Sequence, residues 1–138
     1  MAKTFEDLDA FQHAVDLSVT IYRVTETFPR AELYGLVSQL RRASVSVVSQ
    51  IAEGQGRLSL GEWRQFLGQA RGSLFEIQAQ TIIASRLGYL DASAYKRVRS
   101  AVTRTAKPLA GLIEYVRRRE NKPTTDNRQP RTRVERAT

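Results

Sequence analysis

The feature that most constrains this chain is the spacing of its apolar residues, which recur every three or four positions over four separate segments. This spacing places them along one face of an α-helix, because an α-helix turns once about every 3.6 residues. No segment shows the alternation of apolar and polar residues that is typical of a half-buried strand. The chain is therefore expected to be all-α.

The first two segments are closed by proline and by glycine. The first begins near residue 7 or 9 and ends near Thr27, because Pro29 excludes the residue before it from helical backbone angles. Its stripe consists of Ala10, Ala14, Leu17, Ile21, Val24 and Phe28. The second begins near Glu32 and ends at about Gly54, where two glycines permit a turn. Its stripe consists of Leu33, Leu36, Leu40, Ala43, Val47 and Ile51.

The third segment carries signals for both of its ends. Ser59 is followed three residues later by Glu62, which is the capping-box pattern of a helix N-terminus. Gly88 has the position of a C-cap glycine. The stripe between these ends consists of Trp63, Phe66, Leu67, Ala70, Leu74, Ile77 and Ala84. We expect one long helix.

The fourth segment begins at Asp91 or Ser93 and contains Pro108. Its stripe consists of Tyr95, Val98, Val102, Thr105, Leu109, Leu112 and Val116. A proline inside a helix removes one backbone hydrogen bond and costs about 3 kcal/mol or bends the helix. The stripe stays in phase across Pro108, so we predict one kinked helix.

The connections between these four segments are short, which favours antiparallel neighbours. We therefore predict an antiparallel up-down-up-down four-helix bundle over residues 1–120. Residues 121–138 hold two prolines, five basic residues and one large aliphatic residue, Val134. Such a composition buries too little apolar surface to fold. We predict a disordered basic C-terminal tail.

Catalytic and metal-binding signals are weak in this sequence. His13 is the only histidine and there is no cysteine, so thiolate metal sites and disulfides are excluded. The glutamates of the central segments are Glu32, Glu53, Glu62 and Glu76, and di-metal bundles pair such residues with histidines that this chain lacks. We expect no enzymatic activity, no cofactor and no metal. The sequence has neither a signal-peptide stretch nor a long apolar run, which predicts a cytoplasmic protein without membrane contact.

The formal net charge of +8 is confined to the last third of the chain. Lys/Arg and Asp/Glu cancel over residues 1–90, whereas residues 91–120 carry +5 and residues 121–138 carry +3. The predicted nucleic-acid-binding residues are Lys96, Arg97, Arg99, Arg104, Lys107, Arg117 and Arg118, on the outer side of the fourth helix. This segregation indicates an acidic partner, either the phosphate backbone of RNA or DNA or an acidic protein. A solvated helix face without a partner is the third reading.

Apolar residues beyond the main stripes occur on the two central segments. They are Val45, Val48, Ala52, Phe75, Ile82 and Ile83. Single exposed apolar residues are normal on a protein surface, but several on adjacent helices indicate an interface. We predict that the chain forms a homo-oligomer through these residues.

Several stretches together resemble one known family. They read F-E-D-L at 5–8, F-P-R-A-E-L-Y-G-L at 28–36, Q-L-R-R-A-S-V-S at 39–46, I-A-E-G-Q-G-R at 51–57, G-S-L at 72–74 and L-G-Y-L at 87–90. They resemble the bacterial four-helix-bundle family first noticed as open reading frames in intervening sequences of 23S rRNA genes. The resemblance covers about residues 5–119. Val48 and Gln50 depart from it, because proline and asparagine are usual before the I-A-E-G block.

The resemblance implies an antiparallel four-helix bundle, often assembled as a ring-like pentamer, with no established enzymatic activity. Distant relatives with the same bundle serve as accessory proteins of diversity-generating retroelements. Those relatives bind a reverse transcriptase and nucleic acid. By analogy, the resemblance adds a reverse transcriptase to the partners that can be expected, although a shared fold does not by itself carry a function.

Overall fold

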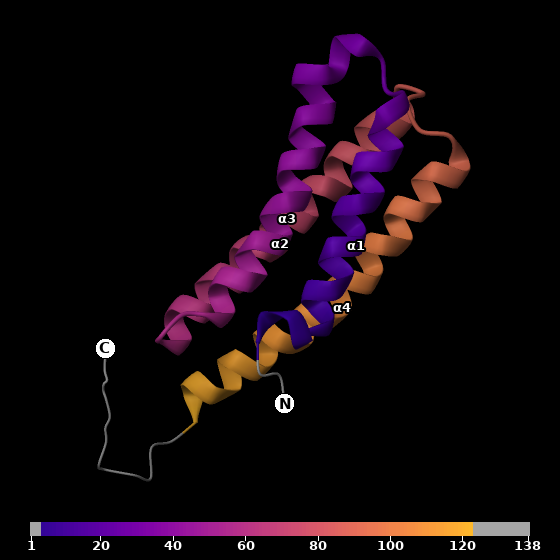
Figure 1. The fold of residues 1–138 in the computed structure, drawn as a ribbon. Coiled ribbons are helices and arrows are strands. Elements are labelled where there is room, and N and C mark those ends of the chain that lie inside the picture. Colours follow the sequence, from indigo (N-terminus) through magenta and orange to yellow (C-terminus); the bar gives the residue numbers. More distant parts are fainter. Residues whose placement is uncertain (1–3, 123–138) are drawn as a thin grey trace.

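The computed structural model describes residues 4–122, which are helical over most of their length and contain no strand (Figure 1). The four long helices are α1 (Asp9–Val24), α2 (Ser38–Gln55), α3 (Leu60–Arg86) and α4 (Ala92–Asn121). The all-α prediction and the order of the helices are confirmed. The predicted basic tail lies, beyond Lys122, outside the described residues.

The helices form a closed ring in which each packs against the helix before it and the helix after it, and α4 returns to pack against α1. In Figure 1, α1 and α4 lie side by side, as do α2 and α3. Short connections reverse the chain direction between successive helices. This is the antiparallel up-down-up-down bundle that the periodicity predicts.

The core is built from the predicted stripes. Its largest fully buried apolar side chains are Leu17, Ile21, Leu40, Ile51, Leu67, Ile77 and Leu109. Complete burial of such a side chain contributes roughly 1.5–3 kcal/mol. Every residue of the first predicted stripe is buried. Apolar burial along the full length of all four helices is thus the main force that holds the bundle together.

Leu33 departs from its predicted stripe, because its side chain is 47% exposed. The reason is a π-helical segment, Leu33–Val37, that precedes α2 and contains non-helical backbone angles at Gly35. A π turn adds a residue to the helical repeat, which rotates whatever lies before it relative to the helix that follows. Downstream of this segment the predicted stripe is correct, and Leu40 is the first of its residues to be fully buried.

The helix ends follow the predicted capping chemistry. The Ser59 hydroxyl accepts a hydrogen bond of 3.1 Å from the backbone N–H of Glu62. Gly88 has a positive φ of 82°, and its N–H donates to the carbonyl of Ser85. The carboxylate of Asp91 accepts from the N–H of Ala94 at 2.7 Å, so α4 is capped by Asp91. These contacts satisfy backbone groups that a helix terminus otherwise leaves unpaired.

Two departures from regular sequence patterns leave their helices intact. α4 continues through Pro108 as one helix, although proline has no N–H to donate to the carbonyl of Arg104. α2 runs without interruption through Val48 and Gln50, the two positions that differ from the family pattern. Within residues 4–122, no helix is long and apolar enough to cross a membrane.

Candidate nucleic-acid interface and the two apolar seams

The I-A-E-G-Q-G-R stretch brings α2 close to α3 at Gly54. A Cβ atom added to Gly54 would lie 2.9 Å from Cδ1 of Trp63 and 3.1 Å from Cβ of Phe66. Arg57 places its guanidinium 4.4 Å from the centre of the Phe66 ring and pairs with Glu53 at 3.5 Å. The stretch therefore serves the packing of the α2–α3 turn.

Glu32 ties the start of α2 to the α3–α4 turn. Its Oε1 accepts from the N–H of Leu36 at 3.1 Å, and its Oε2 accepts from the phenol of Tyr89 at 3.1 Å. The hydrogen bond to this carboxylate raises the pKa of Tyr89 above its ordinary value. Gly35 leaves room for the carboxylate, because an added Cβ would lie 2.7 Å from its Oε1. Glu32 therefore has a structural role in this end of the bundle.

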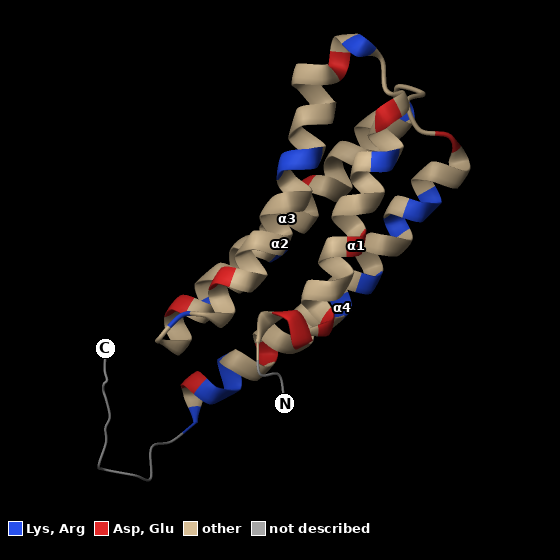
Figure 2. Cartoon of the chain, viewed as in Figure 1, with Lys and Arg blue, Asp and Glu red and all other residues tan. Residues whose placement is uncertain are grey.

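The predicted nucleic-acid-binding residues all have exposed side chains on α4. Figure 2 shows basic residues recurring along this helix. No Asp or Glu occurs between Ala92 and Ile113. At 100° per residue, Lys96 and Lys107 point directly away from the buried side of α4. The outer face of α4 is thus basic, with no acidic residue, over the N-terminal two-thirds of the helix.

Two arginines of this face are held by neighbours on the same helix. Arg99 donates to the Tyr95 hydroxyl at 2.8 Å and lies 5.6 Å from the centre of that ring. Arg104 donates to the Ser100 hydroxyl at 2.6 Å. Hydrogen bonds to neutral hydroxyls orient a guanidinium but leave its charge uncompensated. Both groups therefore remain available to an anion.

Arg117 and Arg118 differ from the other predicted residues, because both pair with Glu114. Arg117 donates to the two oxygens of this carboxylate at 3.0 and 2.6 Å, and Arg118 donates to Oε2 at 2.9 Å. These hydrogen bonds, from Arg117 first and then Arg118, hold the pKa of Glu114 below its ordinary value. One carboxylate thus offsets part of the charge at this end of α4.

Among the described residues, neither Arg41 nor Arg42 forms a salt bridge. Arg41 instead donates to the Thr25 hydroxyl at 2.9 Å and to the Tyr22 carbonyl at 3.1 Å, both at the end of α1. Its guanidinium lies 4.7 Å from the centre of the Tyr22 ring. Arg42 donates to Ser38 on its own helix at 2.8 Å.

The six predicted interface residues do not share one face, because the structure distributes them over two sides of the bundle. Val45, Val48 and Ala52 lie on the side of α2 that turns toward α1. The Ser18 and Ser44 hydroxyls mark this side, since they are 3.0 Å apart across the two helices. Phe75 lines a groove between α3 and α4. In the ring of helices these two sides are opposite each other.

The first side, which we call the α1–α2 seam, includes residues that sequence reasoning missed. On α1 the half-buried or exposed side chains of Phe11, Val15 and Tyr22 follow helical spacing on the side that faces α2, whereas Val19 points away from the bundle. Together with Val45, Val48 and Ala52 the first three make an apolar strip along both helices. The signal was present in the sequence as a second stripe on the first helix, displaced from the buried stripe by about a third of a turn.

The second side, which we call the α3–α4 seam, carries charge as well as apolar surface. Phe75 is 63% exposed, and Ile82 lies seven residues further along the same face of α3. The α4 side of the seam contributes the small side chains of Ala106 and Ala110. Arg71 lines the same groove. Ile83 is also exposed but lies about a quarter of a turn away, on the outward side of α3.

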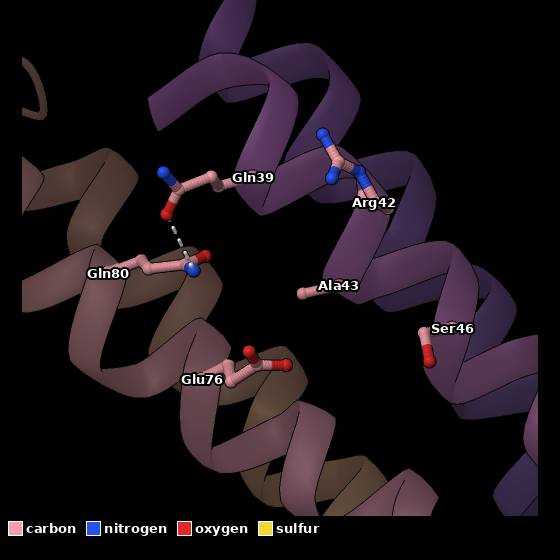
Figure 3. Close-up of a pocket in the computed structure, with 6 residues that line it drawn as sticks. All are labelled: Gln39, Arg42, Ala43, Ser46, Glu76 and Gln80. Atoms are coloured by element: carbon pink, nitrogen blue, oxygen red, sulfur yellow. Dashed lines mark hydrogen bonds between the residues drawn. The ribbon is translucent and has the colours of Figure 1, made fainter. Parts of the chain in front are cut away.

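A polar groove of about 390 Å³ lies between α2 and α3 (Figure 3). Its walls include Gln39 and Gln80, whose amides are hydrogen-bonded at 3.3 Å. Arg42 and Glu76 belong to opposite walls and do not point toward each other (Figure 3). Within residues 4–122, no group of three or more His, Asp or Glu side chains could hold a metal ion.

The arrangement defines a class of protein, an all-α antiparallel four-helix bundle whose last helix presents a basic outer face. The comparison with protein families then makes the assignment specific. The model of the 23S rRNA-intervening sequence protein family matches residues 6–111, and the chain belongs to this family. None of the curated proteins matches the chain.

Proposed function

We propose that this protein is a non-catalytic, homo-oligomeric scaffold that binds nucleic acid through the basic outer face of α4. The observation that carries the proposal is the run from Ala92 to Ile113, which presents five basic side chains and no carboxylate. A helix face that only needs to be soluble usually mixes both signs, because opposite charges one turn apart stabilise the helix. A face of one sign attracts an anionic partner.

The spacing of the basic residues suits a phosphate backbone. Lys96 and Lys107 are eleven residues apart on one helix face, which corresponds to about 16 Å along the axis. Their exposed ammonium groups have no salt-bridge partner among residues 4–122. Contacts of this kind neutralise phosphates without reading bases, so we expect weak sequence specificity.

Self-association is the second part of the proposal, and we assign it to the α1–α2 seam. This strip is apolar along both helices, and among its exposed members Tyr22 and Val45 are 42% and 43% exposed. Exposed apolar patches of this kind mark interaction sites. A ring-like pentamer, the state that the family resemblance implies, would repeat the basic face of α4 in every copy. Repetition strengthens binding to a long polyanion through multivalency.

The test is fluorescence anisotropy with labelled RNA, comparing the natural protein with the variant Lys96→Glu, Arg99→Glu, Lys107→Glu. We expect the three reversals to weaken binding at least 100-fold, because each replaces a phosphate contact by a repulsion. The matched control is Arg23→Glu, Arg30→Glu, Arg42→Glu, which changes the net charge equally at exposed positions on other elements.

The control variant is expected to retain binding within about threefold. Equal losses in both variants would mean that net charge alone governs binding and that α4 is not the site. Full binding by the α4 variant would remove the proposal. Circular dichroism of both variants checks that the helices remain. Among the residues substituted in the two variants, Arg99 alone contacts an aromatic ring of the described part of the chain, that of Tyr95.

A further inference from the structure

The α3–α4 seam has a pattern that the basic face of α4 does not explain. Arg71, Phe75, Ile82 and Arg86 follow one another by four, seven and four positions, which places all of them within about a sixth of a turn on α3. Two cations thus stand at the ends of this line, about 22 Å apart along the helix axis, with an aromatic and an aliphatic side chain between them.

The middle of the seam is hollowed. A groove of about 160 Å³ lies beside Phe75, and its floor includes Val102, Ala106, Leu109 and Ala110 of α4. This volume equals roughly five water molecules at about 30 Å³ each, which suits one ring-sized group. The small alanines keep the groove open and leave the Phe75 ring exposed along its side.

The seam is positively charged along both helices. The only carboxylate between Trp63 and Arg86 is Glu76, and it lines the groove on the other side of α3. Arg71, Arg86 and Arg99 form no salt bridge among residues 4–122. Arg99 lies on the same side of α4 as Ala106 and Ala110, seven and eleven residues before them. The seam is therefore continuous with the basic face already described.

We infer that the α3–α4 seam binds single-stranded nucleic acid and that Phe75 stacks against an unpaired base. The inference rests on the proposed function and names the kind of nucleic acid. Arg71, Arg86 and Arg99 hold the phosphates while the base enters the groove beside Phe75. A positively charged groove with an exposed aromatic ring is the arrangement that proteins use for single strands, because every base presents a π face.

A duplex would leave this seam unused. Its bases are stacked on one another and cannot cover the Phe75 ring, so the apolar middle of the seam would stay in water. A basic face alone would serve a duplex equally well, and no exposed aromatic residue would be needed. The combination of Phe75 with flanking arginines therefore favours an unpaired strand. The phosphate and stacking contacts are shared by RNA and DNA.

The experiment measures anisotropy of three labelled probes, a twelve-residue oligouridylate, the corresponding oligothymidylate and a twelve-base-pair RNA duplex. For Phe75→Ala we expect about 5- to 100-fold weaker binding of the single strands, which is the effect of losing one stacked base. Duplex binding should stay within twofold. The control is Tyr34→Ala, which removes an aromatic side chain that is 92% exposed at the end of the bundle and should change nothing.

The outcomes separate the inference from the proposed function. If the natural protein binds neither strands nor duplex, the proposed function fails. If it binds both and Phe75→Ala affects neither or both equally, the function stands and the inference is overturned. Sedimentation velocity of Phe75→Ala is run alongside, and a changed oligomeric state would also overturn the inference because Phe75 would then belong to a protein interface. A preference between the two single strands identifies which sugar the seam accepts.

Discussion

The α1–α2 seam and the α3–α4 seam lie on opposite sides of the same bundle, and both expose apolar side chains at helical spacing. They differ in charge. The α1–α2 seam includes one arginine, Arg41, which is held by Thr25 and the Tyr22 carbonyl. The α3–α4 seam is bordered by Arg71, Arg86 and Arg99, none of which forms a salt bridge among the described residues.

This difference shows that an exposed apolar surface does not by itself identify the kind of partner that binds there. A nearly neutral apolar strip is suited to another copy of the chain, because it carries no repulsive charge into a symmetric contact. An apolar strip bordered by cations repels its own copy and attracts a polyanion. The four predictions below follow from this contrast.

The largest effect is expected from placing charges in the neutral seam. Val15→Asp with Val45→Asp would bury uncompensated carboxylates in the proposed interface and weaken self-association at least 100-fold. Sedimentation velocity at micromolar concentration measures the change. Phe75→Asp with Ile82→Asp is the matched variant on the other seam and should leave the assembly intact. An assembly that survives in the first variant and dissociates in the second would invert the assignment.

A second prediction concerns the packing between α2 and α3, the two helices that join one seam to the other. Gly54→Ala places a methyl group against Trp63 and Phe66 and should lower the free energy of unfolding by about 1–3 kcal/mol. Gly68→Ala is the control, because nothing lies within 4 Å of its added Cβ. That change should raise the free energy of unfolding by roughly 0.5–1 kcal/mol. Urea denaturation measures both, and equal effects would contradict the account.

A third prediction sharpens the role of the arginines that border the charged seam. Arg71→Gln with Arg86→Gln should reduce the slope of log affinity against log salt for single-stranded RNA by about 1.4, at roughly 0.7 for each lost contact. Arg23→Gln with Arg30→Gln removes two charges elsewhere and should leave the slope unchanged. A slope that does not move in the first variant would place the phosphate path away from this seam.

The smallest effect concerns Glu114, which lowers the positive charge at the end of α4. Its pKa is lowered, so its ion pairs contribute stability above the ordinary carboxyl value and lose it as pH falls through the lowered pKa. Protonation releases Arg117 and Arg118. Glu114→Gln should therefore strengthen RNA binding about two- to threefold at neutral pH, because surface ion pairs of this kind are weak. Carboxyl NMR should show a pKa of Glu114 below the ordinary value of a glutamate, and a pKa at or above that value would contradict the ion pairs.

Much of the fold could be predicted from the sequence because burial follows periodicity. Every residue of the first stripe is buried, and the capping roles of Ser59, Gly88 and Asp91 are local chemistry that four or five residues specify. The exposure of Leu33 could not be predicted in this way. It depends on the π-helical segment Leu33–Val37, which adjoins a contact between distant parts of the chain: the Glu32 carboxylate lies beside Gly35 and accepts a hydrogen bond from Tyr89.

The candidate site was predictable only in part. The basic residues of α4 are close in sequence, so their common face follows from helical geometry. The division of Val45 and Phe75 between opposite seams depends on which neighbour each side of a helix meets, and that order is a property of the ring of helices. Arg71 was missed for the same reason, because it meets α4 only across the α3–α4 seam.

The central claim is that cations of α4 and of the α3–α4 seam bind a nucleic-acid backbone, and its most direct test is the salt dependence of RNA binding by the natural protein. Five contacts, from Arg71, Arg86, Lys96, Arg99 and Lys107, predict a slope of log affinity against log salt of about −3.5 for a single strand. A slope between about −3 and −4 agrees with the account. A slope near zero, or no binding at low salt, would contradict it.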